Sequence, residues 1–455
     1  MTISAPAELP GILQAGPAKK NMTKLIVATS IGNALEWYDI AVYGYFAVYV
    51  SKAFFPNDDP TTSLLLTFGT FGLAFLVRPI GGVVLGAYAD RYGRKASLMI
   101  SIMLMTVGTS VIALMPAYET IGILAPISVL AARLVQGFSA GGEFGSSTAF
   151  LVEHQPERRG FVASWQFASQ GLSNLLASAF GVGLTSWLTP ADMQSWAWRI
   201  PFLFGILVGP IGIYIRNHLE DATPPPAEHA SPIREVLLRQ KFRVLLGIGA
   251  LAISTAVNYL IVYMPTYVVK TLNLAPVVGF AATFAGGVVV TFLTPIAGMI
   301  SDRIGRTTHM IAVNLLLLFS IYPAFLLISR NPTPTVIIVA VFWLSTLKSL
   351  YYGPLAALMS ELLPASTRAT GLGLGYNIGV TLFGGMGPVI MAWLGGIALI
   401  GDLAPGYYLT LVCVVSLVTL ITIRTRPQPR TERDRVAQPV AEPAKASCDG
   451  TMFGS

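Results

Sequence analysis

The chain has 455 residues, of which 54% are hydrophobic and only 11% are charged, and its formal net charge is +7 at pH 7. Soluble domains carry about 25% charged residues, so the composition excludes an ordinary soluble protein. The positive charge could suggest a nucleic-acid partner, but its placement along the chain follows membrane topology instead.

Apolar stretches long enough to cross a membrane recur along the whole chain, since a transmembrane helix needs roughly 20 residues. Twelve of them cover about 25–50, 62–88, 97–115, 121–151, 161–188, 198–215, 243–268, 276–300, 309–328, 334–362, 369–396 and 405–423. We therefore expect an all-α membrane protein with twelve transmembrane helices.

The remaining segments divide this expected protein into five parts. The sequence between two groups of six helices contains Pro224-Pro225-Pro226 and then a mixed-charge stretch, which predicts a cytosolic linker ending in a short helix at the membrane surface. The last residues are rich in proline and charge, which predicts disorder. The predicted parts are a tail (1–24), a six-helix bundle (25–217), the linker (218–242), a second six-helix bundle (243–424) and a disordered tail (425–455).

The 29 lysines and arginines are distributed unevenly. With a cytosolic N-terminus, 22 fall in the tails and even-numbered loops, three lie inside helices, and four lie on the other side: Lys52, Arg199, Lys270 and Arg330. This positive-inside pattern predicts that both termini are cytosolic. The tail 1–24 shows no cleavable signal pattern, and Cys413 and Cys448 have no partner outside the membrane, so we expect no disulfide.

Two short signatures occur in both halves of the chain. The phrase Gly-x-x-x-Asp-Arg-x-Gly-Arg begins at Gly86 and again at Gly298, each time between apolar stretches. A Glu-x-x-Pro sequence followed by arginine begins at Glu153 and again at Glu361. Such repeats indicate a duplicated membrane protein whose two halves are related by pseudo-twofold symmetry, and they favour transport.

With these signatures, the sequence resembles the major facilitator superfamily over about residues 25–424. The stretches 32–39, 78–79, 133–143 and 198–202 are similar to its metabolite–proton symporter family, and 66–90, 262–267 and 272–274 are most similar to the citrate–proton symporters of that family. The resemblance implies two six-helix bundles around a central cavity that opens alternately to the two sides. It also implies that helices 1, 4, 7 and 10 line the cavity.

Six ionisable residues lie at membrane depth, where each costs about 2.5–3.5 kcal/mol at a helix centre on insertion scales. They therefore need partners or a wet cavity. Three are acids and three are bases: Glu36, Asp39 and Glu143, and Arg78, Arg133 and Lys348.

Depth along the helices, at about 1.5 Å per residue, predicts which charges can meet. Glu36 and Asp39 share one helix face. We expect Arg133 near Asp39, as the resemblance also implies, Arg78 near Glu36, and Glu143 below them. An acid that is alternately solvated and paired can load and release a proton, so Asp39, Arg133, Glu36 and Glu143 are the candidate proton-coupling residues. Static structural ion pairs are the alternative.

Lys348 is the remaining buried charge, and with Arg133 and Arg78 it could bind a small carboxylate between the two bundles. The alternative is a lysine that reaches to the membrane surface. Polar and aromatic residues on neighbouring helices could complete a substrate site: Tyr43, Asn258, Tyr259, Tyr351, Tyr352, Gln166, Gln170 and Asn174.

The two Asp-Arg-x-Gly-Arg loops could act as a cytosolic gate, an interpretation that rests mainly on the resemblance. Their residues could cap and pair with neighbouring helix ends, or could serve topology alone. The candidate gating residues are Gly86, Asp90, Arg91, Gly93, Arg94, Asp302, Arg303 and Arg306.

No enzyme, metal site or cofactor is expected. Gly371–Gly375 is not preceded by a strand, and its small residues favour close helix packing. The histidines His154, His218, His229 and His309 lie in loops or at helix ends without a metal-binding cluster.

The sequence predicts a monomeric, proton-coupled importer of a small organic acid, most similar to citrate carriers, in a bacterial inner membrane. The partners are the acid, protons and the lipid bilayer. A symporter of zwitterions such as proline or betaine and an efflux antiporter are the alternatives. The absence of proline between Phe161 and Trp187 counts against efflux, because antiporters of this type carry a Gly-Pro motif there. A sensor and a membrane enzyme are weaker candidates. The particular acid, the proton stoichiometry and any accompanying divalent metal stay open.

Overall fold

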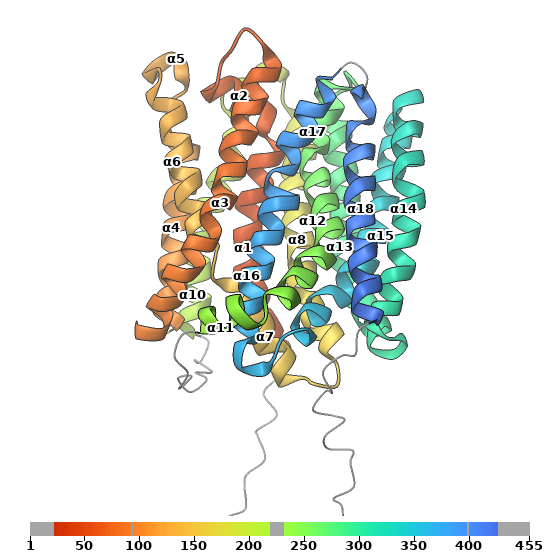
Figure 1. Ribbon diagram of the computed structural model, residues 1–455. Helices are drawn as coiled ribbons and strands as arrows, with labels where there is room; N and C mark the ends of the chain where they lie inside the picture. The colour runs from red at the N-terminus through yellow and green to blue at the C-terminus, as the bar shows by residue number, and fades with distance from the viewer. Residues whose placement is uncertain (1–21, 93, 219–231, 398–399, 426–455) are drawn as a thin grey trace, which may run out of the picture.

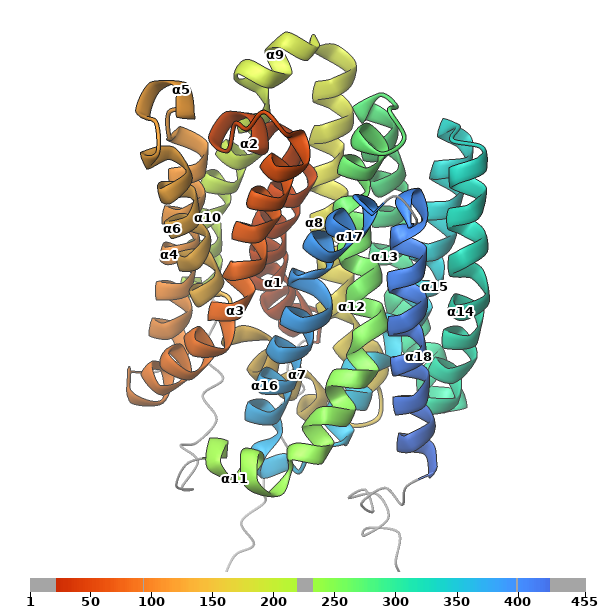
Figure 2. The same ribbon diagram turned by 45° about the horizontal axis from the view of Figure 1, so that its top comes forward.

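The structure, a computed structural model, describes residues 22–92, 94–218, 232–397 and 400–425. The regular elements of these residues are all helical, and the long ones run side by side (Figure 1). The start of α1 and the end of α18 lie at the same end of the molecule, below in Figure 1, while α5 and α9 lie at the opposite end (Figure 2).

The first half of the chain forms ten α-helices. They are α1 (Met22–Tyr45), α2 (Ala47–Phe54), α3 (Pro60–Tyr92), α4 (Arg94–Leu114), α5 (Tyr118–Ile121), α6 (Leu124–Ser139), α7 (Glu143–His154), α8 (Arg159–Trp187), α9 (Pro190–Ser195) and α10 (Ile200–His218), with a 3-10 turn at Ala197–Arg199. The predicted helix 121–151 is thus broken at Ala140–Gly142. The reason is close packing, since a Cβ atom added to Gly141 would lie 2.0 Å from the Arg78 carbonyl oxygen of α3.

The second half forms the other helices. They are α11 (Pro232–Arg239), α12 (Lys241–Lys270), α13 (Pro276–Ile304), α14 (Arg306–Arg330), α15 (Pro334–Glu361), α16 (Arg368–Val380), α17 (Gly387–Gly395) and α18 (Ala404–Thr425), with 3-10 turns at Ala365–Thr367 and Gly401–Leu403. The predicted helix 369–396 is interrupted by a π turn at Thr381–Gly385. Gly384 and Gly385 lie in this turn against the rings of Tyr259 and Phe75, where a Cβ atom would lie 2.5 Å from each ring.

Nine helical stretches of the described residues are long and apolar enough to cross a membrane, which establishes a multi-pass membrane protein. They are Pro60–Tyr88, Ala96–Leu114, Leu124–Glu153, Lys241–Lys270, Pro276–Ile304, Arg306–Arg330, Pro334–Glu361, Ala365–Gly395 and Gly401–Thr425. The predicted spans at 25–50, 161–188 and 198–215 fall outside this set, in α1, α8 and α10. In α1 and α8 the reason is polarity: α1 carries two acids, and buried glutamine, asparagine and serine side chains lie along α8. The count of twelve spans stays a prediction.

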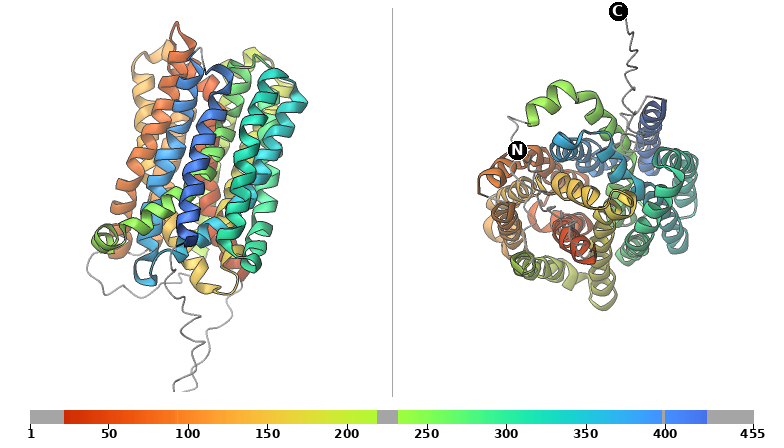
Figure 3. Two further views of the ribbon diagram at one scale, coloured as in Figure 1. Left: turned by 45° about the vertical axis from the view of Figure 1, so that its right-hand side comes forward. Right: turned by 90° about the horizontal axis from the view of Figure 1, so that it is seen from below.

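The two halves of the chain meet along pairs of helices with small residues. α8 packs along α13, and α7 packs along α16. A Cβ atom on Gly160 would lie 2.6 Å from the Gly298 carbonyl oxygen, and one on Gly145 would lie 2.3 Å from the Ala369 carbonyl oxygen. Seen from below, helices of the first half (red to yellow) gather on one side and most helices of the second half on the other (Figure 3). This contact surface is where the buried polar groups collect.

Candidate functional site

The six charges predicted at membrane depth lie on five helices. Five of them are buried, with relative exposures of 0–8%: Glu36 and Asp39 on α1, Arg78 on α3, Arg133 on α6 and Lys348 on α15. Glu143 begins α7 and is partly exposed. Burial at this level means that each charge must be compensated by a partner or a ligand.

The predicted contact between Glu36 and Arg78 is confirmed as a direct ion pair. The Arg78 guanidinium also donates to the Ala140 carbonyl oxygen at 3.2 Å, and it lies over the rings of Phe75 and Trp37 at 5.2 and 5.9 Å. Its Nε and Nη1 atoms have no hydrogen-bond partner within the part of the chain that the structure describes. Arg78 is therefore neutralised, yet it retains free donors.

Arg133 lies near Asp39, as expected, but the two are linked through the side chains of Gln136 and Thr109 and not by a direct ion pair. Arg133 Nη1 donates to Gln136 Oε1 at 2.8 Å, Gln136 Nε2 donates to Thr109 Oγ1 at 2.9 Å, and Thr109 Oγ1 donates to Asp39 Oδ2 at 2.7 Å. The direction of this chain follows from chemistry: arginine only donates, so the glutamine must turn its oxygen to Arg133 and its amide nitrogen to Thr109. Every donor of the chain points toward the Asp39 carboxylate.

Arg133 is held by aromatic faces instead of a carboxylate. Its guanidinium carbon lies 4.3 Å from the ring centre of Tyr43 and 5.1 Å from that of Phe71. The Tyr43 hydroxyl is bound to the Thr70 hydroxyl at 2.7 Å. Such cation–π contacts contribute about 0.5–2 kcal/mol. They fix the position of Arg133 without cancelling its charge, and they place Tyr43 beside the site as a supporting residue.

Lys348 is fully buried in the second half. Its ammonium donates to Asn258 Oδ1 at 2.7 Å and lies 4.9 Å from the ring centre of Tyr352. Asn174 of α8 approaches the same Asn258 oxygen at 3.5 Å. Among the described residues, no ion pair includes Lys348. The structure thus rules out a lysine that reaches the surface, and it leaves the positive charge beside the contact between the two halves.

Several buried polar atoms around these charges lack a hydrogen-bond partner in the described structure. They are Gln166 Nε2 and Oε1, Gln170 Oε1, Asn258 Nδ2, the Tyr259 hydroxyl, Arg133 Nε and the two Arg78 nitrogens. A buried polar group without a partner costs about 1–3 kcal/mol. These atoms supply donors and acceptors that a polar ligand can satisfy.

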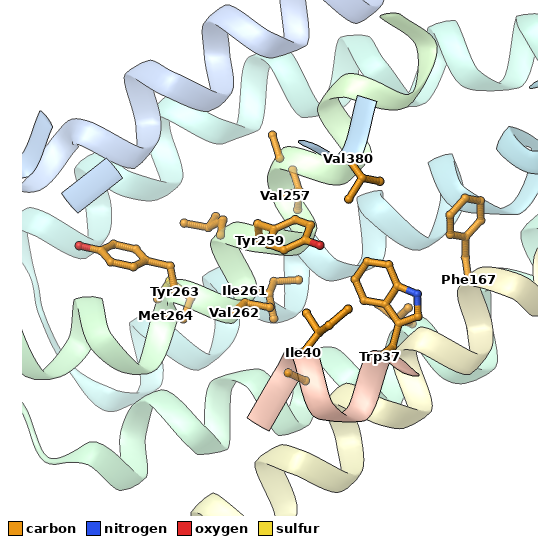
Figure 4. Packing of buried hydrophobic residues seen from close by; sticks show 14 of the residues in the cluster. Trp37, Ile40, Phe167, Val257, Tyr259, Ile261, Val262, Tyr263, Met264 and Val380 are labelled. Carbon is orange, nitrogen blue, oxygen red and sulfur yellow. The ribbon is translucent and has the colours of Figure 1, made fainter. Parts of the chain in front are cut away.

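Aromatic side chains lie between the charges of the first half, Arg78 and Arg133, and the second half of the chain. Tyr259 projects from α12 and faces Trp37 of α1, with ring centres 6.1 Å apart (Figure 4). It also contacts Phe71 and Phe75 of α3 at 5.9 and 5.4 Å. The second-half tyrosine therefore packs against the rings that cover Arg78 and Arg133.

The expected role of Tyr351 is not supported by its position. Its hydroxyl donates to the Ala250 carbonyl oxygen at 2.7 Å, within the second half. The next residue, Tyr352, covers Lys348 and stacks on Phe167 of α8 at 4.1 Å. On a helix, neighbouring residues point about 100° apart, so only one of the two tyrosines can face the site.

Three side chains near Gln170, Arg133 and Asp39 were not anticipated. Tyr376 of α16 accepts from Gln170 Nε2 at 3.1 Å and stacks on Phe144 at 3.5 Å. Gln136 and Thr109 complete the Asp39 chain. Gln136 could have been found, since an amide three residues after Arg133 shares its helix face.

The loop signature of the second half joins the two halves at the end where the termini lie. Asp302 accepts backbone hydrogen bonds from Gly160 and Phe161 at 2.9 and 3.1 Å, at the N-terminus of α8. Arg306 pairs with Asp302 and with Glu361, each at 2.8 Å. A carboxylate at a helix N-terminus is stabilised by about 0.3–1 kcal/mol, or up to about 2 kcal/mol when partly buried.

A second contact between the halves joins the two copies of the Glu-x-x-Pro signature. Glu153 of the first copy forms an ion pair with Arg368 of the second, with nitrogen and oxygen 2.9 Å apart. In the first loop signature, Arg91 lies over the Tyr92 ring at 5.3 Å, and a Cβ on Gly86 would meet nothing within 4 Å. Arg303 is exposed. Gly93 and the side chains of Asp90 and Arg94 lie outside the described residues.

A bundle of apolar helices with ionisable side chains buried among them is the architecture of a membrane transporter and not of an enzyme. The family model of the Major Facilitator Superfamily matches residues 29–384. The chain therefore belongs to this superfamily, and within it to the metabolite–proton symporters. It is 38% identical over 400 residues to a citrate-proton symporter of Klebsiella pneumoniae, covering 86% of this chain and 90% of that protein. It is 34% identical over 421 residues to a proline/betaine transporter of Escherichia coli, covering 89% and 83%.

The fold is also similar to solved structures. The xylose transporter XylE from E. coli, in a partially occluded inward-open conformation, matches with a TM-score of 0.71 at 15% identity, covering 90% of this chain and 99% of that structure. At this identity the match concerns the fold alone.

Proposed function

We propose that this protein is a proton-coupled symporter that imports a small organic acid, a citrate-like di- or tricarboxylate, by alternating access. The observation that carries the proposal is the pair of buried cations, Arg133 and Lys348, for which the described residues provide no directly paired carboxylate. The relatives named as citrate-proton symporters, at 38% and 36% identity, support the same substrate class.

Charge counting favours a substrate with more than one negative charge. Glu36 neutralises Arg78. Asp39 balances Arg133 only through Thr109 and Gln136. When Asp39 takes up a proton, Arg133 and Lys348 remain as two positive charges at buried positions, which attract a polyanion strongly because the surrounding dielectric is low.

The hydrogen-bond chain supplies the link between proton and substrate. A charged Asp39 draws Thr109, Gln136 and Arg133 toward itself. A protonated Asp39 is a weaker acceptor, so Arg133 becomes free to turn to a substrate carboxylate. Proton loading therefore promotes anion binding, and proton release restores the resting chain. Arg133 itself keeps its proton throughout.

Uptake of a zwitterion is the second candidate, and the relatives at 34% identity named as proline/betaine transporters support it. The rings of Trp37 and Tyr259 could face a quaternary ammonium group. A zwitterion carries one carboxylate, however, and would compensate one of the two cations. Efflux is the third candidate and differs in the direction of net transport.

Counterflow in proteoliposomes separates these candidates. Vesicles loaded with citrate, a dicarboxylate, proline or glycine betaine are tested for exchange with the labelled compound, and net uptake is then driven by an outside-acidic pH gradient. We expect counterflow with di- or tricarboxylates and their uptake under the gradient. Exchange confined to proline or betaine would support the second candidate, and uptake driven only by an inside-acidic gradient would support efflux.

We further propose the membrane arrangement that the charge distribution predicts: twelve crossings in two bundles (25–217 and 243–424), with tails 1–24 and 425–455 and the linker 218–242 in the cytosol of a bacterial cell. The shared end of α1 and α18 supports an even number of crossings (Figure 1). Reporter fusions between 217 and 230 should indicate the cytosol, and fusions between 56 and 60 the periplasm. A periplasmic signal from the linker would contradict the two-bundle arrangement.

We propose that the contacts of Asp302 and Glu153 form a gate that closes the cytosolic side between the halves. Asp302→Asn removes the charge at the N-terminus of α8 and the pairing with Arg306. We expect transport turnover to fall at least fivefold while substrate affinity changes less than twofold, because these contacts lie far from Lys348. Rates and counterflow affinities in proteoliposomes measure both.

The matched control for the gate is Asp192→Asn, a partly exposed acid whose carboxylate caps α9 at the opposite end of the molecule. It should leave turnover unchanged. A large loss of affinity at normal turnover in Asp302→Asn would argue against a gate.

A further inference from the structure

A cavity, here called the side cavity, lies wholly within the first half of the chain. It is bounded by α1, α4, α10 and the junction of α6 and α7, and its wall includes Glu36, Asp39, Glu143, Ser101 and Ser139. On α1, Asp39 lies about 4.5 Å farther than Glu36 from the end of the molecule where the termini lie. None of the residues that line this cavity belongs to the second half, which in the proposed function supplies Lys348 and Asn258 to the substrate site.

Water can enter the side cavity. The space open to the centres of water molecules is about 40 Å³, whereas one ordered water needs roughly 10–15 Å³ on this measure and two or more polar partners. Glycines keep the space next to Asp39 open: a Cβ atom on Gly205 of α10 would lie 2.7 Å from Asp39 Oδ1. The carboxylates and serine hydroxyls of the wall supply the polar partners.

The side cavity extends from Asp39 toward the end where the termini lie. Its wall reaches Gly32 on α1, which lies about 10 Å before Asp39 along the helix axis. On α4 it reaches Ser101, in the second turn of that helix. The side cavity therefore runs along the half of the membrane that we assign to the cytosolic side.

At this same end, the passage between the two halves is tied shut. Asp302 caps α8, Glu153 pairs with Arg368, and Asn377 of α16 donates to the Gly141 carbonyl oxygen at 2.6 Å. None of these groups belongs to the wall of the side cavity. Asp39 thus faces a cavity that has room for water and extends toward the cytosolic end, while contacts between the halves close the substrate route at that end.

We propose that the side cavity is a proton passage for Asp39, separate from the substrate pathway and usable while the contacts between the halves are closed. This rests on the proposed proton coupling. In the release step, the O–H bond of the Asp39 carboxyl breaks, the proton bonds to a water molecule of the cavity, and the carboxylate regains the bond from Thr109. The hydronium leaves past Glu36 and Glu143, whose carboxylates favour a cation.

The charged and titratable groups around Asp39 fit this step. Glu36 lies one helical turn away on α1 and is paired with Arg78. Tyr38 donates its hydroxyl to the Pro201 carbonyl oxygen at 2.9 Å. Arg133 acts from the α3–α6 side through Gln136 and Thr109. The regained chain to Arg133 stabilises the deprotonated carboxylate and so favours release.

Filling the mouth of the side cavity tests the proposal. Ser101→Phe narrows it, and Val107→Phe, on the same helix but 58% exposed, is the control. In proteoliposomes, we expect uptake driven by a pH gradient to fall at least fivefold in Ser101→Phe. Exchange of preloaded substrate should stay within twofold, because exchange needs no proton release. Val107→Phe should leave both rates unchanged.

Reversible blocking repeats the test on one folded protein. Ser101→Cys is treated with a methanethiosulfonate reagent and then with a reductant, with Val107→Cys as its control. Treatment should slow gradient-driven uptake of Ser101→Cys without slowing exchange, and reduction should restore it. Equal loss of uptake and exchange, or no effect of blocking at all, would overturn the proposal. An untreated wild-type protein without gradient-driven uptake would instead contradict the proton coupling itself.

Discussion

Asp39→Asn is expected to abolish accumulation of substrate against its gradient, so that a pH gradient drives no more than equilibration. Asparagine has the size of the protonated carboxyl and can still accept from Thr109 through Oδ1, but it cannot release a proton. Exchange of preloaded substrate should therefore persist near the wild-type rate. The measurement is labelled substrate inside proteoliposomes, with and without an outside-acidic gradient.

The control for this variant is Glu119→Gln, an exposed acid of α5, which should accumulate substrate as the wild type does. Accumulation by Asp39→Asn at the wild-type level would move the proton to another acid. Glu36 would then be the next candidate, because it lies on the same helix face and lines the same side cavity.

Lys348→Gln is expected to weaken binding of a di- or tricarboxylate at least tenfold, which corresponds to about 1.4 kcal/mol. Glutamine can still donate to Asn258 Oδ1, so the hydrogen bond survives while the charge disappears. Loss of affinity should grow with the number of carboxylates on the substrate. Lys348→Arg should retain part of the affinity, since it preserves the charge. Competition for counterflow by a series of mono-, di- and tricarboxylates measures the effect.

Lys241→Gln is the matched control, because this lysine is exposed at the start of α12. Unchanged affinity in Lys348→Gln would remove the lysine from the substrate site. Preferred transport of glycine betaine by the wild type would contradict the polyanion interpretation and favour the zwitterion candidate.

The two predictions address different steps of one cycle. In the proposed cycle, Asp39 governs whether Arg133 is engaged by its own chain of hydrogen bonds, while Lys348 supplies the cation of the second half. We propose that a substrate with two carboxylates bridges these two cations and so draws the halves together. This gives a physical reason for coupling between proton loading, anion binding and the change of access.

Much of the architecture follows from the sequence by itself. Composition and apolar run length determine a helical membrane protein, because an apolar helix of about 20 residues is the structure that satisfies its own backbone in lipid. Depth along a helix is also a property of sequence, because each residue adds about 1.5 Å to the helix axis. It correctly paired Glu36 with Arg78, and it put Arg133 at the level of Asp39.

The tertiary structure decided which face of each helix meets which neighbour. Rotation about a helix axis and the distance between helices are set by packing, so the sequence could not show that Thr109 and Gln136 stand between Asp39 and Arg133. Packing likewise turned Tyr352 toward Lys348 and Tyr351 toward the Ala250 carbonyl oxygen. The side cavity is the clearest case, since it is bounded by helices far apart in the chain and held open beside Asp39 by a glycine of α10.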